Sequence, residues 1–215
     1  MKTTLAITTL ALIACTGSAN AGLIVNGTFE GGTIAPATSS YPTDPVMWPE
    51  GRYNVVTSDT LHPLWVDFFD HTSGNGESGF MIVNGTTEGN GPSWTDTVEV
   101  EPGTEFVLSA WLASLYPAAI ATVSLRVIGL GDETGTVIAQ SDVTAPEALA
   151  TWEQRTLAFN SGDFNALRIE VWDTNQVAGG NDYAIDDIAL TAVPTPGAAA
   201  LAGMGLVIAA RRRRN

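Results

Sequence analysis

Short runs of alternating apolar and polar residues, or of β-branched and aromatic residues, recur along most of the chain. Turn-forming clusters at 72–76 and 178–181 separate some of them. No stretch between residues 22 and 192 keeps a helical apolar period over three turns. About ten short strands at such spacing predict an all-β domain, a jelly-roll β-sandwich. The expected strands are 52–57, 63–69, 79–84, 94–100, 105–113, 122–128, 136–140, 152–159, 166–172 and 183–191.

Residues 1–21 are typical of a secretory signal peptide for the Sec export machinery. A short basic start precedes an apolar stretch at 5–14, and Ala19-Asn20-Ala21 forms a small-x-small cleavage site. Cleavage there would leave a domain over 22–192. A second interpretation stays open, because residues 12–15 resemble a bacterial lipobox that would make Cys15 a lipidated first residue. Either way the folded domain contains no cysteine and no disulfide.

The chain ends in a proline-marked break, an uncharged stretch at 197–210 and a basic cluster. The stretch of 14 residues would span only about 21 Å as a helix, whereas a bilayer core of about 30 Å needs about 20 residues. This arrangement over 193–215 resembles the PEP-CTERM sorting signal, which an exosortase recognises and cleaves in Gram-negative bacteria. Pro194-Thr195-Pro196 departs from the usual Pro-Glu-Pro, and a plain tail anchor is the alternative. The basic cluster consists of Arg211, Arg212, Arg213 and Arg214.

Residues 22–192 are strongly acidic. They hold all 23 acidic residues of the chain against four arginines, so their net charge is near −19, compared with −14 for the whole sequence. Nucleic acid and anionic membrane surfaces are excluded as natural partners, because binding to phosphate needs a basic surface. Such a charge suits divalent cations or simple solubility.

Four segments, in this order, resemble the landmarks of the galactose-binding-like jelly rolls, especially carbohydrate-binding modules of families 4, 9 and 22. They are 23–30 (LIVNGTFE), 98–112 (VEVEPGTEFVLSAWL), 152–159 (WEQRTLAF) and 182–190 (DYAIDDIAL). The resemblance covers the whole domain and implies its fold. It says less about the ligand, because this fold hosts many functions.

The resemblance also implies a structural Ca²⁺ that ties the first strand to the last. Carried over to this chain, the ligands would be the carbonyl of Thr28, the carboxylate of Glu30, the carbonyl of Gly79 and the carboxylate of Asp186, with Asp187 in reserve. Oxygen ligands of this kind are those that Ca²⁺ prefers. The alternative is that the two aspartates only end a solvated edge.

Aromatic residues give the candidate recognition surface, because sugar rings stack on aromatic faces. Strand alternation puts Trp111 and Trp172 on polar faces, whereas Trp152 resembles the packing tryptophan of the family. Trp65 and Tyr53 lie in the region where the family places its binding loops. The predicted carbohydrate-binding residues are therefore Tyr53, Trp65, Trp111 and Trp172, although packing in the core is an alternative for each.

Catalytic motifs are scarce in the sequence. It has two histidines and no nucleophile elbow, zinc-binding histidine pair or phosphate-binding glycine loop. His71 beside Asp70 could form a base and its orienting group, and the many carboxylates leave glycoside hydrolysis open. The sequence predicts a non-enzymatic protein that reaches the cell surface or extracellular matrix after transient insertion in the inner membrane. It would bind exopolysaccharide or envelope glycan; a structural or adhesive envelope or biofilm protein without a small ligand is the alternative.

Overall fold

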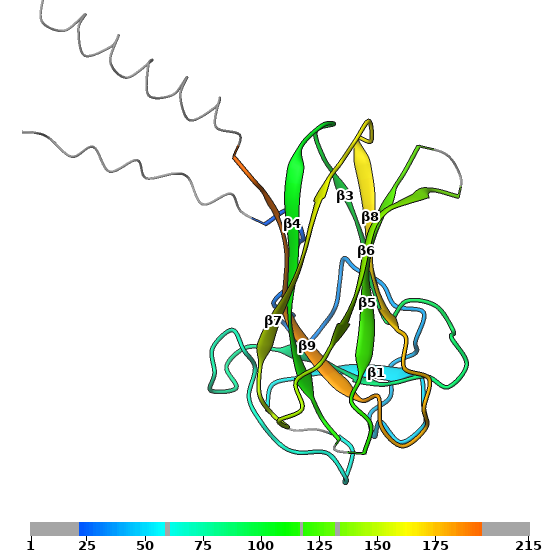
Figure 1. The fold of residues 1–215 in the computed structure, drawn as a ribbon. Helices are drawn as coiled ribbons and strands as arrows, with labels where there is room; N and C mark the ends of the chain where they lie inside the picture. Colours follow the sequence, from blue (N-terminus) through cyan, green and yellow to red (C-terminus); the bar gives the residue numbers. More distant parts are fainter. Residues whose placement is uncertain (1–21, 59–60, 117, 132–133, 195–215) are drawn as a thin grey trace, which may run out of the picture.

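The computed structural model describes residues 22–58, 61–116, 118–131 and 134–194, and within these ranges it is all β (Figure 1). Five strands form one antiparallel sheet in the order β1-β2-β9-β4-β7, and four form a second in the order β3-β8-β5-β6. The prediction of a jelly-roll β-sandwich is confirmed. The strands are β1 (Arg52–Val56), β2 (Phe80–Asn84), β3 (Trp94–Glu99), β4 (Glu105–Ser114), β5 (Thr122–Gly129), β6 (Thr136–Thr144), β7 (Glu153–Asn160), β8 (Ala166–Asp173) and β9 (Tyr183–Ala192).

The main core lies between the two sheets and takes one face of each strand. On β4 the buried inward side chains include Phe106, Leu108 and Leu112. On β8 they include Leu167 and Ile169. Successive side chains of a strand point to opposite faces, so the alternation in the sequence becomes one buried face. Each large apolar side chain buried here contributes about 1.5–3 kcal/mol.

A second hydrophobic cluster covers the outer face of the five-stranded sheet. The segment 61–79, between β1 and β2, lies over this face and packs Trp65 and Phe68 onto it. Strand β2 is consequently buried on both faces, with Met81 in the main core and Phe80 in the second cluster. The buried members of the second cluster are Met47, Trp65, Phe80, Ile82, Ala113, Leu115 and Ala184.

The prediction of a strand at 63–69 is wrong. This segment forms a turn, in which the N–H of Trp65 donates to the carbonyl of His62 at 3.1 Å, followed by irregular backbone. Its apolar residues pack onto the sheet from outside instead of pairing with a strand. A burial pattern produced by a covering loop can therefore imitate strand alternation.

The segment 23–30, expected to hold the first strand, forms turns as well. Asn26 and Phe29 have positive φ angles of 58° and 54°, which a strand does not allow. The segment still lies along β9, because the N–H of Ile188 donates to the carbonyl of Gly27 at 2.9 Å.

Strands β4 and β9 run the length of the sandwich. Phe106 pairs with Ala192 at one end, and Ser114 pairs with Tyr183 at the other. The described chain begins and ends beside the first of these pairs: the N–H of Leu23 donates to the carbonyl of Leu190 at 3.1 Å, and that of Val193 donates to Glu105 at 2.8 Å. The loop after β4 and the loop before β9 therefore lie at the opposite end from the two termini of the domain.

The predicted signal peptide (residues 1–21) lies outside the described residues, as do Pro196 and the four C-terminal arginines. Pro194 is described and is exposed. Among the residues that the structure describes, no helix is long and apolar enough to cross a membrane.

Candidate functional site

The loop before β1 holds one tryptophan side chain out in solvent. Asp44 Oδ1 accepts hydrogen bonds from the N–H groups of Val46 (2.8 Å) and Met47 (2.9 Å), which forms an Asx turn. Met47 has a positive φ of 51° and is fully buried in the second cluster. Asn84 Nδ2 donates to the carbonyl of Met47 at 2.8 Å. Because Met47 is anchored in this way, the next residue, Trp48, lies at the surface and is 61% exposed.

Three rings are in contact from the surface inward at this place, the first two stacked and the third tilted by 32° from the second. Trp48 and His62 have ring centroids 4.8 Å apart and planes 18° apart. His62 and Trp65 have centroids 5.0 Å apart. Trp65 is buried, and its Nε1 donates to Oδ2 of Asp182 at 2.9 Å. The exposed Trp48 is thus backed by a fixed aromatic column, which ends on a buried carboxyl group.

A cavity of about 260 Å³ opens beside this column. It combines three aromatic rings with two carboxyl groups and one carboxamide. Ligand pockets usually measure about 300 Å³ or more, so this cavity suits a group about as large as one sugar ring. Its lining residues are Trp48, Glu50, His62, Leu64, Asn84, Tyr116, Gly179 and Asp182.

Three titratable groups of this cavity have shifted pKa values. Burial, together with the nearby Glu50 and Asp173, raises the pKa of Asp182 to about 7, against the lowering effect of the hydrogen bonds from Trp65 and Gly85. Burial also raises the pKa of Glu50. Burial lowers the pKa of His62 below its usual 6.5, so this ring is neutral at neutral pH.

A further buried carboxyl group, that of Asp173, supports the wall of the cavity. Its Oδ2 accepts from the N–H of Thr86 at 2.7 Å and from Nδ2 of Asn181 at 2.9 Å. Burial raises the pKa of Asp173 to about 7. Asn181 also donates to the carbonyl of Asn175 at 2.7 Å. These bonds join the segment after β2 to the loop between β8 and β9, and so fix the residue before Asp182.

Two predicted binding aromatics pack into the protein. Trp65 is only 7% exposed and belongs to the second cluster, so it supports the column instead of offering a free face. Tyr53 on β1 is half-buried and packs against the main core, and burial raises its pKa. The structure therefore does not bring these two side chains to one surface.

Trp111 lies on the outer face of β4, as the alternation predicts, but a loop residue covers it. The ring of His71 stacks on Trp111 with centroids 3.7 Å apart and planes 18° apart. His71 Nδ1 lies 2.6 Å from Oδ2 of Asp187. The predicted pairing of His71 with Asp70 is not formed, because Asp70 caps its own loop and accepts from the N–H groups of Gly74 (3.2 Å) and Gly76 (2.9 Å).

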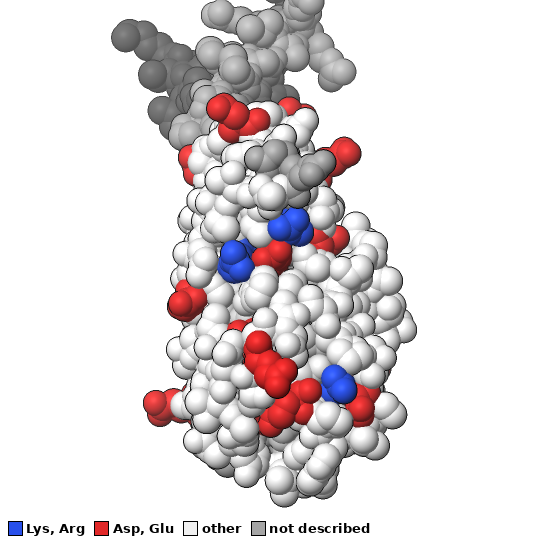
Figure 2. All heavy atoms as spheres, turned by 90° about the vertical axis from the view of Figure 1, so that its right-hand side faces the viewer, with Lys and Arg blue, Asp and Glu red and all other residues white. Residues whose placement is uncertain are grey.

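Trp172 lies on the outer face of the four-stranded sheet among charged side chains. The guanidinium carbon of Arg126 lies 4.9 Å from the Trp172 ring centroid, and Trp172 Nε1 donates to Oε2 of Glu170 at 2.6 Å. Glu170 also pairs with Arg168 at 2.8 Å. Figure 2 shows the side of the molecule that lies on the right in Figure 1, where acidic side chains are spread widely and basic ones are few. Arg126 thus occupies one face of Trp172.

The residues predicted to bind calcium come from three adjacent segments. Gly79 packs against the carbonyl of Phe29, and Glu30 Oε1 accepts from the hydroxyl of Ser78 at 2.6 Å. Asp186 is fully buried, and its Oδ2 accepts from the N–H of His71 at 2.8 Å. Burial raises the pKa of Asp186 to about 7.

The described residues contain no group of three or more His, Cys, Asp or Glu that could hold a metal ion. A calcium site at Thr28, Glu30, Gly79 and Asp186 would thus need main-chain oxygens for most of its coordination, and it stays a prediction.

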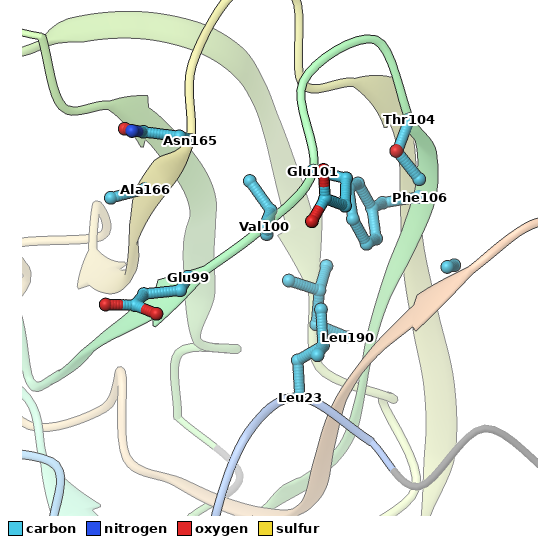
Figure 3. A pocket seen from close by; sticks show the side chains of 10 residues that line it. Leu23, Glu99, Val100, Glu101, Thr104, Phe106, Asn165, Ala166 and Leu190 are labelled. Atoms are coloured by element: carbon cyan, nitrogen blue, oxygen red, sulfur yellow. The ribbon is translucent and has the colours of Figure 1, made fainter.

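A larger cavity of about 690 Å³ lies at the other end of the sandwich. Figure 3 shows Leu23, Val100, Phe106 and Leu190 converging on it from four segments, with Glu101 at its edge. This cavity is the open end of the main core, next to the first and last described residues. Among its described lining residues Phe106 is the sole aromatic one, and it is buried, so these residues offer no exposed ring for stacking.

The sequence-based prediction missed Trp48, Glu50, His62, Asn84, Tyr116 and Asp182. Trp48 belongs to no alternating run, and its neighbours in the cavity come from five separate segments. One local signal was present: prolines at 45 and 49 flank Trp48, which indicates a stiff loop and not a strand.

No protein family matches the sequence, and no curated protein does either. Solved structures do share its fold. The Stig cyclase Fisc from Fischerella sp. TAU, in complex with an indole compound, is 14% identical with a TM-score of 0.52, covering 81% of this chain and 98% of the cyclase. The enzymatically active domain of tailspike protein 4 from bacteriophage CBA120 is 18% identical with a TM-score of 0.51. It covers 80% of this chain, which spans only 21% of the tailspike chain.

A family 16 carbohydrate-binding module is 19% identical with a TM-score of 0.49, and the match covers 79% of this chain and 99% of the module. At such identities the likeness shows the fold alone, and the choice of ligand has to come from the residues of the site.

Proposed function

We propose that this domain binds carbohydrate without cleaving it, at the cavity beside Trp48. The observation that carries the proposal is the exposed Trp48 ring, stacked on His62 next to a cavity lined by Glu50, Asn84 and Asp182. A flat ring offers a surface for the C–H face of a sugar, while carboxyl and carboxamide groups accept and donate hydrogen bonds to its hydroxyls. The fixed aromatic column behind Trp48 means that little ordering is needed on binding.

Affinity at one such site should be modest. Aromatic stacking adds only about 0.5–1.5 kcal/mol beyond the area that it buries. Many copies on one surface would raise the overall avidity without any new contact. This suits a protein that holds exopolysaccharide or envelope glycan.

We further propose that the protein is exported by the Sec machinery and sorted to the cell surface or extracellular matrix by an exosortase, after transient insertion in the inner membrane. The support is in the sequence: the signal peptide over 1–21 and the PEP-CTERM-like segment over 193–215. A structural Ca²⁺ at Thr28, Glu30, Gly79 and Asp186 belongs to the same proposal.

Affinity electrophoresis of the full-length protein against a panel of soluble polysaccharides tests the binding function. We expect at least one glycan to retard the wild type, and Trp48→Ala to lose this retardation. The matched control is Phe69→Ala, because Phe69 is also an exposed aromatic residue (50%) but does not line the cavity. Lack of retardation by every glycan would favour the structural or adhesive protein without a small ligand.

Glycoside hydrolysis is the second candidate function, favoured by the presence of Glu50 and Asp182 in one cavity. Both have raised pKa values, as a general acid needs. Release of reducing ends by the wild type, and its loss in Glu50→Gln, would establish hydrolysis. Retardation without such release supports binding alone.

A further inference from the structure

We propose that the Trp48 cavity selects a sugar that carries a free, protonated amino group, such as a de-N-acetylated hexosamine. This inference rests on the proposed carbohydrate binding and names the ligand class. The first observation that supports it is a charge imbalance: Glu50 and Asp182 line the cavity, and none of the lining residues that the structure describes is a lysine or an arginine. The one basic side chain among these described lining residues, that of His62, is neutral at neutral pH.

The partners of these two carboxyl groups within the protein are neutral. Asp182 is only 7% exposed and accepts from the Trp65 indole at 2.9 Å and, weakly, from the Gly85 amide at 3.4 Å. The ion pairs formed by the described residues involve other acids, namely Asp44, Glu153, Glu170 and Asp187. A buried carboxylate without an opposite charge is unfavourable, so a cation in this cavity would offset the charge of the buried Asp182, and the exposed Glu50 would add a second negative charge beside it.

An ammonium group matches the remaining features of the cavity. It carries three N–H donors, which suits two carboxyl groups and the carbonyl oxygen of Asn84. The face of Trp48 attracts a cation through its ring quadrupole, most strongly where water is partly excluded. An N-acetyl group would replace this charge with a neutral amide, and a uronic acid would add repulsion.

A bare divalent cation fits this cavity less well. Ca²⁺ requires six to eight oxygen ligands, whereas the described residues contain no group of three or more acidic or metal-binding side chains suited to a metal. The aromatic rings that line the cavity supply none of the oxygen ligands that Ca²⁺ requires, but they suit the apolar face of a sugar.

The test is isothermal titration calorimetry of the full-length protein with two probes of equal length: chitosan oligosaccharide, whose sugars carry free amines, and chitin oligosaccharide, whose sugars are N-acetylated. The titrations are run near neutral pH, because more acidic buffer would protonate Asp182, whose pKa is about 7, and an ammonium and a carboxylate favour each other's charged form. We expect the chitosan oligosaccharide to bind roughly tenfold more tightly or better, since a charge-assisted hydrogen bond is about twice as strong as a neutral one. We expect Glu50→Gln to reduce this preference to near unity.

Asp142→Asn is the matched control, because this acid is exposed on β6, outside the cavity, and its loss changes the net charge by the same amount. Its preference for chitosan should stay as in the wild type. Equal losses in Glu50→Gln and Asp142→Asn would assign the preference to the overall charge and overturn the inference. Asp182→Asn is a second cavity variant, and melting curves of every variant show whether it is folded.

The remaining outcomes separate the two proposals. Equal binding of the two oligosaccharides, abolished by Trp48→Ala, would leave carbohydrate binding intact and overturn the amine selection. Binding of neither probe, with retardation by another glycan in electrophoresis, would also overturn only the amine selection. No binding of any glycan would remove both proposals.

Discussion

The ring of His71 lies flat on Trp111, with centroids 3.7 Å apart, and its Nδ1 is 2.6 Å from Oδ2 of Asp187. One histidine therefore joins the loop between β1 and β2 to strand β4 and to strand β9. It also covers a face of the indole that a sugar would need for stacking. A tryptophan on a polar strand face is thus used here to hold a covering loop.

His71→Ala should weaken the domain without changing glycan binding. The variant loses a stacked pair, worth about 0.5–1.5 kcal/mol in addition to the apolar area that it buries. It also loses a hydrogen bond worth about 1 kcal/mol. Urea denaturation should show a loss of about 1–3 kcal/mol in the free energy of unfolding. If glycan retardation falls while the variant stays folded, the binding surface includes the His71 and Trp111 pair.

Alanine substitutions of Trp48 and Trp65 should have different effects on stability, although both rings belong to one aromatic column. Trp65→Ala removes a side chain that is 93% buried, and should lower the free energy of unfolding by about 3–5 kcal/mol. Trp48→Ala changes an exposed side chain and removes one stacked pair, so it should lower the free energy of unfolding by only about 0.5–1.5 kcal/mol. Denaturation curves of both variants decide this. A large loss in Trp48→Ala would assign that ring to packing.

The domain should become more stable as the pH falls from neutral toward the usual carboxyl pKa. Burial raises the pKa values of Asp173 and Asp182 from 3.8 to about 7, with added repulsion among these two and Glu50. Each group then binds protons on folding, so its contribution to stability is full below 3.8 and is lost as the pH rises through about 7.

Melting temperatures measured across this pH range check the prediction. A double variant, Asp173→Asn with Asp182→Asn, should have a flatter profile, because amides do not titrate. Asp70 contributes in the opposite direction at lower pH. Although burial raises its pKa, hydrogen bonds from Ser73, Gly74 and Gly76 lower the pKa overall, so its contribution to stability is lost as the pH falls. A wild-type midpoint that rises steadily up to neutral pH would contradict the assignment of raised values.

Calcium should stabilise the folded protein if the predicted site exists. A ligand at a hundred times its dissociation constant adds about 2.7 kcal/mol. Thermal melting with and without a chelator measures this, and Glu30→Gln should abolish the difference. The control is Glu77→Gln, since Glu77 is an exposed acid outside the predicted ligand set. A midpoint that the chelator leaves unchanged in wild-type protein would remove the site.

The C-terminal segment should be absent from the mature protein in its host. Mass spectrometry of surface and matrix fractions should find a chain that ends near Pro194 to Pro196. Detection of only uncleaved protein in the inner membrane, with Arg211–Arg214 retained, would favour the plain tail anchor. Detection of a lipid on Cys15 would instead assign the anchor to the other end.

Alternation predicted nine of the strands because each has at least one face against the main core, and this periodicity is local. The expectation failed at 63–69, where the apolar side chains pack onto a sheet from a loop and resemble a strand in sequence alone. Whether such a segment pairs as a strand or packs over a sheet as a loop depends on residues outside it, such as Phe80. A short stretch of sequence does not contain them.

The candidate site was harder to predict for the same reason. The outward direction of Trp111 follows from alternation, but its cover by His71 depends on the path of a loop. Trp48 has no periodic neighbours, and its exposure depends on the anchoring of Met47 and on a hydrogen bond from Asn84. Short-range patterns thus specify which face a strand side chain takes, whereas the composition of a cavity is a property of the tertiary structure.

Strand β9 leads from the cavity to the last described residues of the chain. It starts directly after Asp182 and runs ten residues to Ala192, a distance of roughly 30 Å at about 3.3 Å per residue. The first and last described residues lie at the other end of β9, where Leu23 donates to Leu190 and Val193 donates to Glu105. A domain tethered through its C-terminal end would therefore present the Trp48 cavity at its far tip. Neighbouring copies on a crowded surface could then all face outward, with the stem of each sandwich serving as a spacer.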